Sequence, residues 1–316
     1  MTERLQPYNG VLLVNKPSGL TSHDVVQRLR KTLNQRRIGH TGTLDPLAEG
    51  LLVVCLGRAT KIARFLTGWD KAYEADVFLG LTSKTFDREG IEQSDIAQPP
   101  PTLTVDAIER LLAPFRGRIV QTVPAYSSVQ VDGQRLYKRA RRGEDIAPPT
   151  REIEIKKLSV LTWDSPHLRL LVTCSKGTYI RSLANDVGKA VGCGAYLDGL
   201  QRISVGSLHL DDSLTLDSIQ QQHESGTLEA LVLPCHQVLD YSAIRVTAEF
   251  SQHVVEGPEL TDADVVQIEG AFEAGDTVLL KNDQGIVLAV GTAETSSLDF
   301  HRTSDHGLFE YVRVLN

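Results

Sequence analysis

The run Gly50–Gly57, GLLVVCLG, constrains the fold of this chain more than any other stretch. Its apolar and β-branched residues between two glycines predict a strand buried in a core. The turn before it, TGTLDP, is rich in Gly and Thr and carries one carboxylate, Asp45, followed by Pro46. A residue before proline is biased towards extended backbone. We therefore expect the turn to present a rigidly aimed, exposed Asp45 side chain where the chain enters the core.

Other segments of the first 240 residues alternate between strand and helix patterns. Thr21 or Ser22 is expected to cap a helix whose polar face is basic. Strands are predicted at 10–19, 50–57, 71–80, 153–163 and 168–177, and helices at 21–33, at 58–66, from about 104 and from 178. Residues 124–150 are turn-rich and basic, which is typical of a long functional or mobile excursion from the core.

The composition changes after about residue 240, where short alternating strands with Gly turns predict a small β-rich domain. Residues 241–316 carry four Lys/Arg against thirteen Asp/Glu, a net charge of −9, whereas residues 1–240 carry 29 against 27. We therefore expect two domains, residues 1–240 and 241–316. Local clusters steer a polyanion more than total charge does. The first part holds two basic clusters: Arg28, Arg30, Lys31, Arg36 and Arg37, and Arg135, Lys138, Arg139, Arg141 and Arg142.

Several protein classes are disfavoured by the sequence. With 41% hydrophobic and 23% charged residues it is typical of a globular protein. It has no apolar run near the roughly 18 residues of a membrane span and no signal-peptide pattern, so we expect a cytoplasmic protein. Its cysteines lack CxxC pairing, which favours buried thiols over zinc sites or disulfides; they are Cys55, Cys174, Cys193 and Cys235.

The aspartate turn allows more than one interpretation from spacing alone. Asp45 is compatible with an Asx turn, in which its carboxylate binds nearby backbone N–H groups. Glu49 lies four residues on, so a two-carboxylate glycosidase or nucleoside hydrolase is also conceivable. Because Asp45-Pro46 does not continue a helix, the spacing does not place both carboxylates on one face.

Four motifs in order resemble the TruB family of tRNA pseudouridine synthases. The match runs over roughly residues 10–210, and the basic excursion at 124–150 is similar to that family's RNA-gripping insertion. The tail is similar to the PUA domain often fused to these enzymes. The four motifs are KPSGLTSHDVV (16–26), GHTGTLDPLAEGLL (39–52), KAYEADVFLGLTSKTFDREG (71–90) and CSKGTYIRSLANDVG (174–188).

The resemblance implies an α+β fold with a mixed, mostly antiparallel sheet flanked by helices, followed by a small C-terminal β-rich domain. It implies isomerisation of the uridine at position 55 in the T-arm loop of tRNA, without a metal or organic cofactor. We expect a monomer, with tRNA as its partner and no membrane association.

Roles for individual residues follow from the same resemblance. Asp45 matches the essential aspartate, Arg181 the arginine that pairs with it, and Tyr73 the tyrosine that stacks on the base and takes a proton late. His40 matches the histidine that separates the target nucleotide from its stack, and Leu200 an apolar residue beside the pocket. Lys16 matches a motif that supports the catalytic loop. The basic residues expected to bind RNA are Arg135, Lys138, Arg139, Arg141 and Arg142.

The chemistry requires such residues, because isomerising a glycosidic bond needs an ionised carboxylate near the sugar or base. An arginine opposite Asp45 is expected to lower the pKa of that carboxyl. An aromatic platform would hold the loosened uracil. Each residue also has a structural alternative: Tyr73 as an ordinary strand tyrosine, His40 as a turn histidine, and Arg181 paired with Asp186 on its own helix.

Two other functions stay open at this point. The protein could act chiefly as an RNA-binding chaperone of tRNA folding, or as a hydrolase that uses Asp45 and Glu49. The acidic tail departs from what phosphate binding requires. We therefore expect the tail to make few RNA contacts, through Arg302, or to act mainly in packing.

Overall fold

The computed structural model describes residues 8–92, 98–127, 129–131, 133–144, 148–299 and 308–315. These residues form a nine-stranded sheet with the order β1-β3-β10-β4-β9-β8-β5, in which β2 pairs with β3 and β11 with β10. Its paired strands are antiparallel apart from β10 and β3, so the expected mixed, mostly antiparallel sheet is confirmed. The strands are β1 Gly10–Lys16, β2 Ile38–His40, β3 Glu49–Leu56, β4 Lys71–Leu79, β5 Gly117–Thr122, β8 Thr150–Asp164, β9 His167–Cys174, β10 Ala195–Val205 and β11 Leu208–His209.

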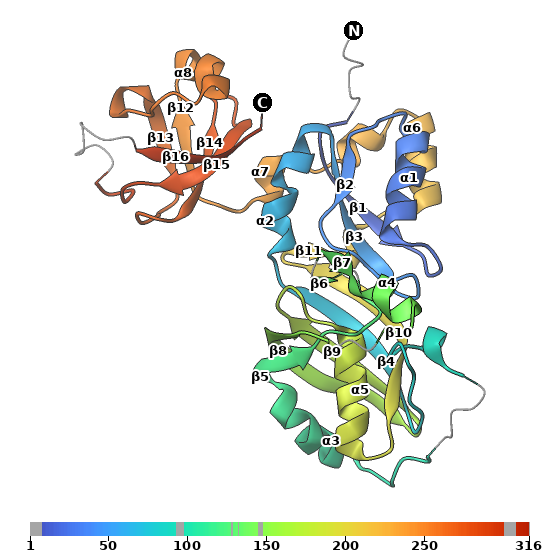
Figure 1. Ribbon diagram of the computed structural model, residues 1–316. Helices are drawn as coiled ribbons and strands as arrows, with labels where there is room; N and C mark the ends of the chain where they lie inside the picture. Colours follow the sequence, from blue (N-terminus) through green and yellow to red (C-terminus); the bar gives the residue numbers. More distant parts are fainter. Residues whose placement is uncertain are drawn as a thin grey trace.

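Helices cover two parts of this sheet (Figure 1). The first core cluster packs α1 and α6 against β1, β2 and β3. The second packs α3 and α5 against β4, β8, β9 and β10. Thr21 caps α1 as predicted, because its hydroxyl accepts from the Asp24 N–H at 3.0 Å while the Asp24 carboxylate accepts from the Thr21 N–H at 2.9 Å. The helices are α1 Ser22–Thr32, α2 Ala63–Thr67, α3 Val105–Leu112, α4 Leu136–Arg141, α5 Ile180–Val191, α6 Leu216–Glu224, α7 Cys235–Val238 and α8 Ala248–His253.

The short parallel contact between β3 and β10 lies next to the aspartate turn. Arg202 of β10 pairs with Gly50 of β3 and, on its other side, with Tyr73 of β4. Gly50 has φ +95°, and a Cβ there would lie 2.4 Å from the Arg202 carbonyl oxygen. Only glycine fits this close approach, which brings the entrance of β3 directly against β10.

The C-terminal residues form a separate five-stranded sheet with the order β13-β12-β14-β15-β16. It lies beside α2 and α7 in Figure 1, and apolar residues of both sheets share one cluster at the junction. The β-rich tail is therefore confirmed, while the domain boundary at residues 240 and 241 stays a prediction. The strands are β12 Ala243–Val246, β13 Val265–Glu269, β14 Thr277–Lys281, β15 Val287–Ala293 and β16 Phe309–Val314.

The segments predicted as strands and helices form these elements, with one difference. The predicted helix at 58–66 is a 3₁₀ turn, Gly57–Ile62, that continues into α2. Several further elements were not predicted, among them β2, β5, β10 and α6. The excursion at 124–150 forms the small hairpin β6 Gln130–Val131 and β7 Gln134–Arg135, followed by α4. Among the described residues, no helix is both long and apolar enough to span a bilayer.

The predicted burial of the thiols is largely confirmed. Cys55, Cys174 and Cys193 are buried and unbridged, while Cys235 is half-buried.

Candidate active site

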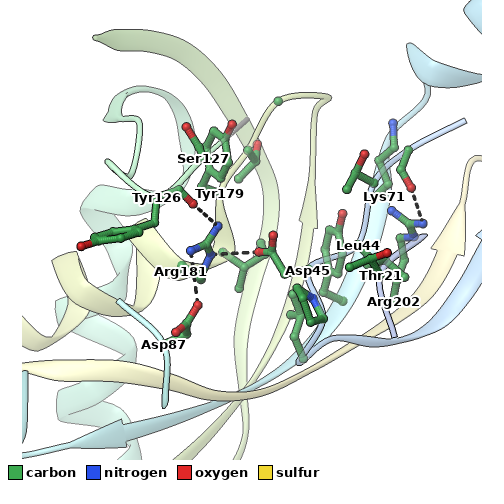
Figure 2. Close-up of a pocket in the computed structure, with 18 of the residues that line it drawn as sticks. Thr21, Leu44, Asp45, Lys71, Asp87, Tyr126, Ser127, Tyr179, Arg181 and Arg202 are labelled. Carbon is green, nitrogen blue, oxygen red and sulfur yellow. Dashed lines mark hydrogen bonds and ion pairs between the residues drawn. The ribbon is translucent and has the colours of Figure 1, made fainter. Parts of the chain in front are cut away.

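A pocket of about 730 Å³ opens between the aspartate loop (residues 41–48), β4, the start of α5 and the excursion at 124–150. Its volume falls in the range of roughly 300–1,000 Å³ that is typical of small-ligand sites. Figure 2 shows the side chains that converge on it. Of the residues proposed from the sequence, the pocket is lined by Asp45, Tyr73, Arg141, Arg181 and Leu200.

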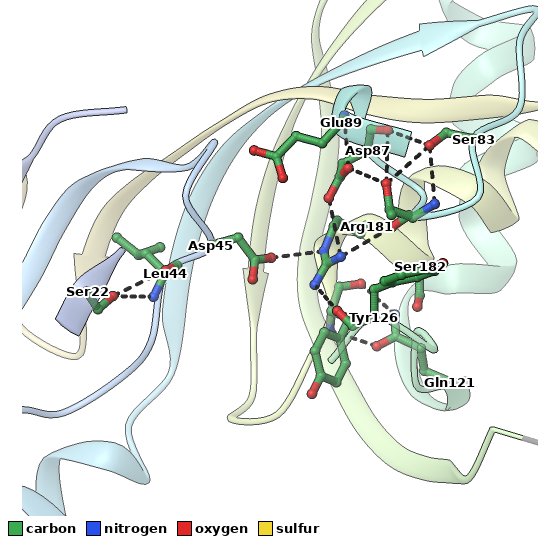
Figure 3. A network of polar contacts seen from close by, with 12 residues as sticks. Ser22, Leu44, Asp45, Ser83, Asp87, Glu89, Gln121, Tyr126, Arg181 and Ser182 are labelled. Carbon is green, nitrogen blue, oxygen red and sulfur yellow. Dashed lines mark hydrogen bonds and ion pairs between the residues drawn. The ribbon is translucent and has the colours of Figure 1, made fainter. Parts of the chain in front are cut away.

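The aspartate loop is fixed through its own backbone on either side of Asp45, and Figure 3 shows the contact at Leu44. The buried Ser22 hydroxyl of α1 accepts from the Leu44 N–H at 2.8 Å and donates to the Leu44 carbonyl at 3.2 Å. On the other side, the Pro46 carbonyl accepts from the Lys16 ammonium at 3.4 Å. The direction of the Asp45 side chain is therefore set by bonds to α1 and β1.

Lys16 supports this loop and does not reach the pocket. Its side chain is fully buried, and its Nζ also donates to the carbonyls of Pro17 at 2.9 Å and Leu20 at 2.6 Å. Burial lowers the pKa of Lys16 to about 8, although nearby Asp45 opposes that shift. A fully buried ammonium fits the supporting role that the resemblance implies for Lys16, and it does not fit direct contact with a substrate.

Arg181 of α5 binds three separate segments, one of which carries Asp45 (Figure 3). Its Nε forms an ion pair with Asp45 Oδ2 at 2.9 Å. Its Nη1 lies 3.2 Å from Asp87 Oδ2, and its Nη2 donates to the Tyr126 carbonyl at 3.2 Å. With 6% of its side chain exposed, Arg181 is held in one orientation. The alternative pairing with Asp186 is wrong, because that carboxylate pairs with Lys189.

The sequence analysis expected Arg181 to lower the pKa of the Asp45 carboxyl, but in the structure this pKa is raised. Burial raises the pKa of the Asp45 carboxyl above its ordinary value, and the adjacent Arg181 only partly offsets the rise. Asp87, on the far side of Arg181, adds to it. The side chain is still 37% exposed, towards the pocket, and it makes no hydrogen bond to its own turn among the described residues, so the Asx-turn alternative is wrong.

Tyr73 and Leu200 also form part of the pocket wall. Tyr73 lies on β4 with 8% exposed surface, and Leu200 lies on β10 with 9%. Burial raises the pKa of the Tyr73 phenol, and the neighbouring Arg202 opposes the rise. The pocket therefore combines a carboxylate, an aromatic ring and an apolar side chain, as stacking and proton transfer on a planar base require.

The remaining residues proposed from the sequence lie outside the pocket lining. His40 is half-buried at the end of β2, and burial lowers its pKa. Arg135 and Lys138 are exposed on β7 and α4. Arg139 and Arg142 pair with Glu144 at 2.8 Å and 2.7 Å.

Glu49, the second carboxylate of the hydrolase alternative, does not line the pocket. It is exposed on β3 and accepts from Gln201 at 3.3 Å. A two-carboxylate site built from Asp45 and Glu49 therefore has no support in the geometry. Arg302, the residue through which the tail was expected to reach RNA, lies outside the described residues.

Asp87 and Arg202 are among the charged residues of the site that sequence reasoning missed. Asp87 is 3% exposed and holds Arg181, and its place in the motif TSKTFDREG was the available signal. Arg202 is 2% exposed and lines the pocket two residues after Leu200, on the strand that was not predicted. In the described part of the chain, no three His, Cys, Asp or Glu side chains gather to hold a metal ion.

Comparison with known proteins gives one consistent family. Residues 30–180 match the model of the TruB family pseudouridylate synthase N-terminal domain, residues 181–240 the tRNA pseudouridylate synthase B C-terminal domain, and residues 242–310 the PUA domain. A tRNA pseudouridine synthase B of Xanthomonas campestris is 42% identical over 88% of this chain and 88% of its own length. That of Xylella fastidiosa is 38% identical over 92% and 93%.

Solved structures with the same fold include an archaeal box H/ACA Nop10–Cbf5 complex. Its matching chain has a TM-score of 0.75 at 24% identity, and the match covers 99% of this chain and 88% of that chain. An H/ACA RNP bound to a substrate RNA containing 2′-deoxyuridine gives a TM-score of 0.75 at 23% identity, over 97% and 85%.

Proposed function

The chain belongs to the TruB family and is a tRNA pseudouridine synthase, and from this we propose that its target is the uridine at position 55 of the T-arm loop. We propose Asp45 as its essential catalytic group. The observation that carries the proposal is the Asp45–Arg181 ion pair at 2.9 Å, which faces a pocket also lined by Tyr73 and Leu200. This is the arrangement that isomerisation of a flipped nucleotide requires.

The reaction begins when the target uridine leaves the loop and enters the pocket, at a cost of about a few kcal/mol. The ionised Asp45 carboxylate then attacks as a nucleophile or removes a proton at the ribose, and the bond between the uracil nitrogen and the ribose C1′ breaks. Arg181 keeps the carboxylate charged and oriented. Leu200 packs against the loosened base.

Completion of the reaction needs a rotation and a proton transfer. The uracil rotates on the Tyr73 ring and rejoins C1′ through its carbon 5. Carbon 5 then loses its proton, which the uncharged Tyr73 hydroxyl relays by accepting it and passing its own proton to water, while N1 of the uracil takes up one proton from water. Because substrate and product are isomers, the reaction needs no co-reactant, and we propose that it runs without a metal or organic cofactor.

Binding of the tRNA falls to the basic excursion at 124–150, which we propose closes over the T arm. Its cations are suited to phosphate contacts, and Arg141 already lines the pocket. We assign His40, at the end of β2, to separation of the target from its stack. We further propose that the protein is a cytoplasmic monomer whose acidic tail makes few RNA contacts.

Mapping the product tests the position directly. An unmodified tRNA transcript incubated with the protein would be treated with a carbodiimide that marks pseudouridine, and the marked site read by primer extension. We expect one stop at position 55, and none in a transcript carrying cytidine there. A stop elsewhere would overturn the position, and tight tRNA binding without any stop would favour the folding chaperone.

A further inference from the structure

Arg202 is a buried cation that the proposed mechanism does not use. It is one of the two largest fully buried side chains among the described residues, the other being Lys16. In that part of the chain no carboxylate lies within ion-pair distance of it, whereas Arg181 pairs with both Asp45 and Asp87. A buried charge is costly unless its hydrogen bonds are satisfied. The hydrogen-bond partners of Arg202 therefore indicate which role the buried guanidinium has.

Those partners lie on the two sides of Asp45, one at the start of the aspartate loop and one on β3, three residues after the loop ends. Arg202 Nη2 donates to the Gly42 carbonyl at 3.0 Å, three residues before Asp45 (Figure 2). Its Nε donates to the Leu51 carbonyl at 2.7 Å, at the start of the buried part of β3. A single planar guanidinium thus joins the two segments that flank the carboxylate, and its donors lie in a fixed fork, which an ammonium on a flexible stem lacks.

The same side chain is coupled to the base platform. Arg202 of β10 is the direct cross-strand partner of Tyr73 of β4, so both side chains project from the same face of the sheet. Both line the pocket.

We propose that Arg202 is a positioning residue of the synthase reaction, which fixes the aspartate loop and the Tyr73 ring relative to each other. With 2% of its surface exposed, it offers almost no surface to the tRNA. It acts on the chemical step by holding the carboxylate and the platform at the separation that the flipped uridine requires. This role rests on the proposed function.

The test compares Arg202→Met and Arg202→Lys with a control, Arg116→Met. Arg116 also donates to a backbone carbonyl, that of Leu158 at 2.9 Å, and it neither lines the pocket nor belongs to the two basic clusters. Single-turnover release of tritium from carbon 5 of uridine would be measured with saturating enzyme. The Kd for tRNA and the melting temperature of each variant would be measured alongside.

For Arg202→Met we expect a rate about 100-fold lower, the scale that a misplacement of about 1 Å produces, with the Kd for tRNA within about twofold. Arg202→Lys keeps the charge but not the fork, and should recover part of the loss, to about tenfold below wild type. Arg116→Met should keep the wild-type rate.

A wild-type rate for Arg202→Met would overturn the proposal, as would a loss confined to the Kd. If Arg202→Met does not fold, the test rests on Arg202→Lys. A wild-type single-turnover rate for Arg202→Lys then overturns the proposal. A wild-type protein that releases no label would instead contradict the proposed function, so the two failures are distinguishable.

Discussion

The aspartate loop and the basic excursion form two walls of one pocket but are built in opposite ways. The loop at 41–48 is held by buried donors, Ser22, Lys16 and Arg202, that bind its backbone. The excursion at 124–150 presents mainly exposed cations, two of which pair with its own Glu144. Precise placement of one carboxylate requires a rigid, dehydrated frame, whereas attraction of a polyanion is shared among many replaceable charges.

This comparison predicts that changes in the buried frame act on the rate and changes in the excursion act on binding. Arg181→Met removes the cation that keeps Asp45 charged and oriented. The single-turnover rate should fall by about 10²–10³-fold, the scale for losing one electrostatic contact of a catalytic site. The Kd for tRNA, measured by filter binding, should change by less than about threefold. A variant that binds tRNA poorly but reacts at the normal rate would break the comparison.

Asp87→Asn should give a smaller loss and a pH signature. Asp87 holds Arg181, so the plateau rate should fall by about 10–100-fold, the cost of a hydrogen bond to a charged group.

Asp87 also raises the pKa of Asp45, and the reaction needs Asp45 ionised. The wild-type rate should therefore decline on the acid side at a higher pH than an ordinary aspartate would give. In Asp87→Asn this decline should move to lower pH. A pH–rate profile measured under single turnover checks the sign, and an acid limb that moves upward would contradict the electrostatic account.

In the excursion, Lys138→Gln should leave the single-turnover rate unchanged and weaken tRNA binding a few-fold. The slope of log K against log salt should fall by about one, as expected for one lost phosphate contact. Glu144→Gln should have the opposite effect on binding, because it removes the carboxylate that pairs with Arg139 and Arg142. It should tighten binding and steepen the slope. If wild type, Lys138→Gln and Glu144→Gln had equal slopes of log K against log salt, the excursion would not contact the RNA.

The smallest effect is expected in the C-terminal sheet. Arg313→Gln replaces an exposed cation of β16 in a tail of net charge −9. We expect the Kd for tRNA to change by less than about twofold and the salt slope to stay constant. A loss as large as that of Lys138→Gln would show that the tail binds RNA despite its charge.

Sequence patterns predicted the frame of the molecule well wherever the pattern was local. Residues 10–19 and 21–33 carry their period and their cap within the segment, and both elements form as expected. Strand β10 was missed because Asp198 and Gly199 interrupt its apolar pattern and its pairing shifts register twice. Arg202 was missed with it.

The electrostatics of the site depend on contacts between distant segments, which no local pattern encodes. Asp87 and Arg181 are separated by 94 positions, and their contact exists only after β4 and α5 pack together. The expected fall in the pKa of Asp45 considered Arg181 alone. Burial by the surrounding segments reverses it. The sequence motifs predicted that Asp45 and Arg181 meet, whereas the burial that raises the pKa of Asp45 depends on the whole fold.

The central claim, that Asp45 performs the chemistry within a frame that other residues hold, is tested most directly by tritium release. Unmodified tRNA transcript labelled at carbon 5 of uridine would be incubated with wild type, with Asp45→Asn and with Glu49→Gln. We predict release by wild type and by Glu49→Gln, and a loss of at least about 10⁴-fold in Asp45→Asn, the scale for removal of a catalytic nucleophile or base, with tRNA binding retained. Substantial release by Asp45→Asn would contradict the account.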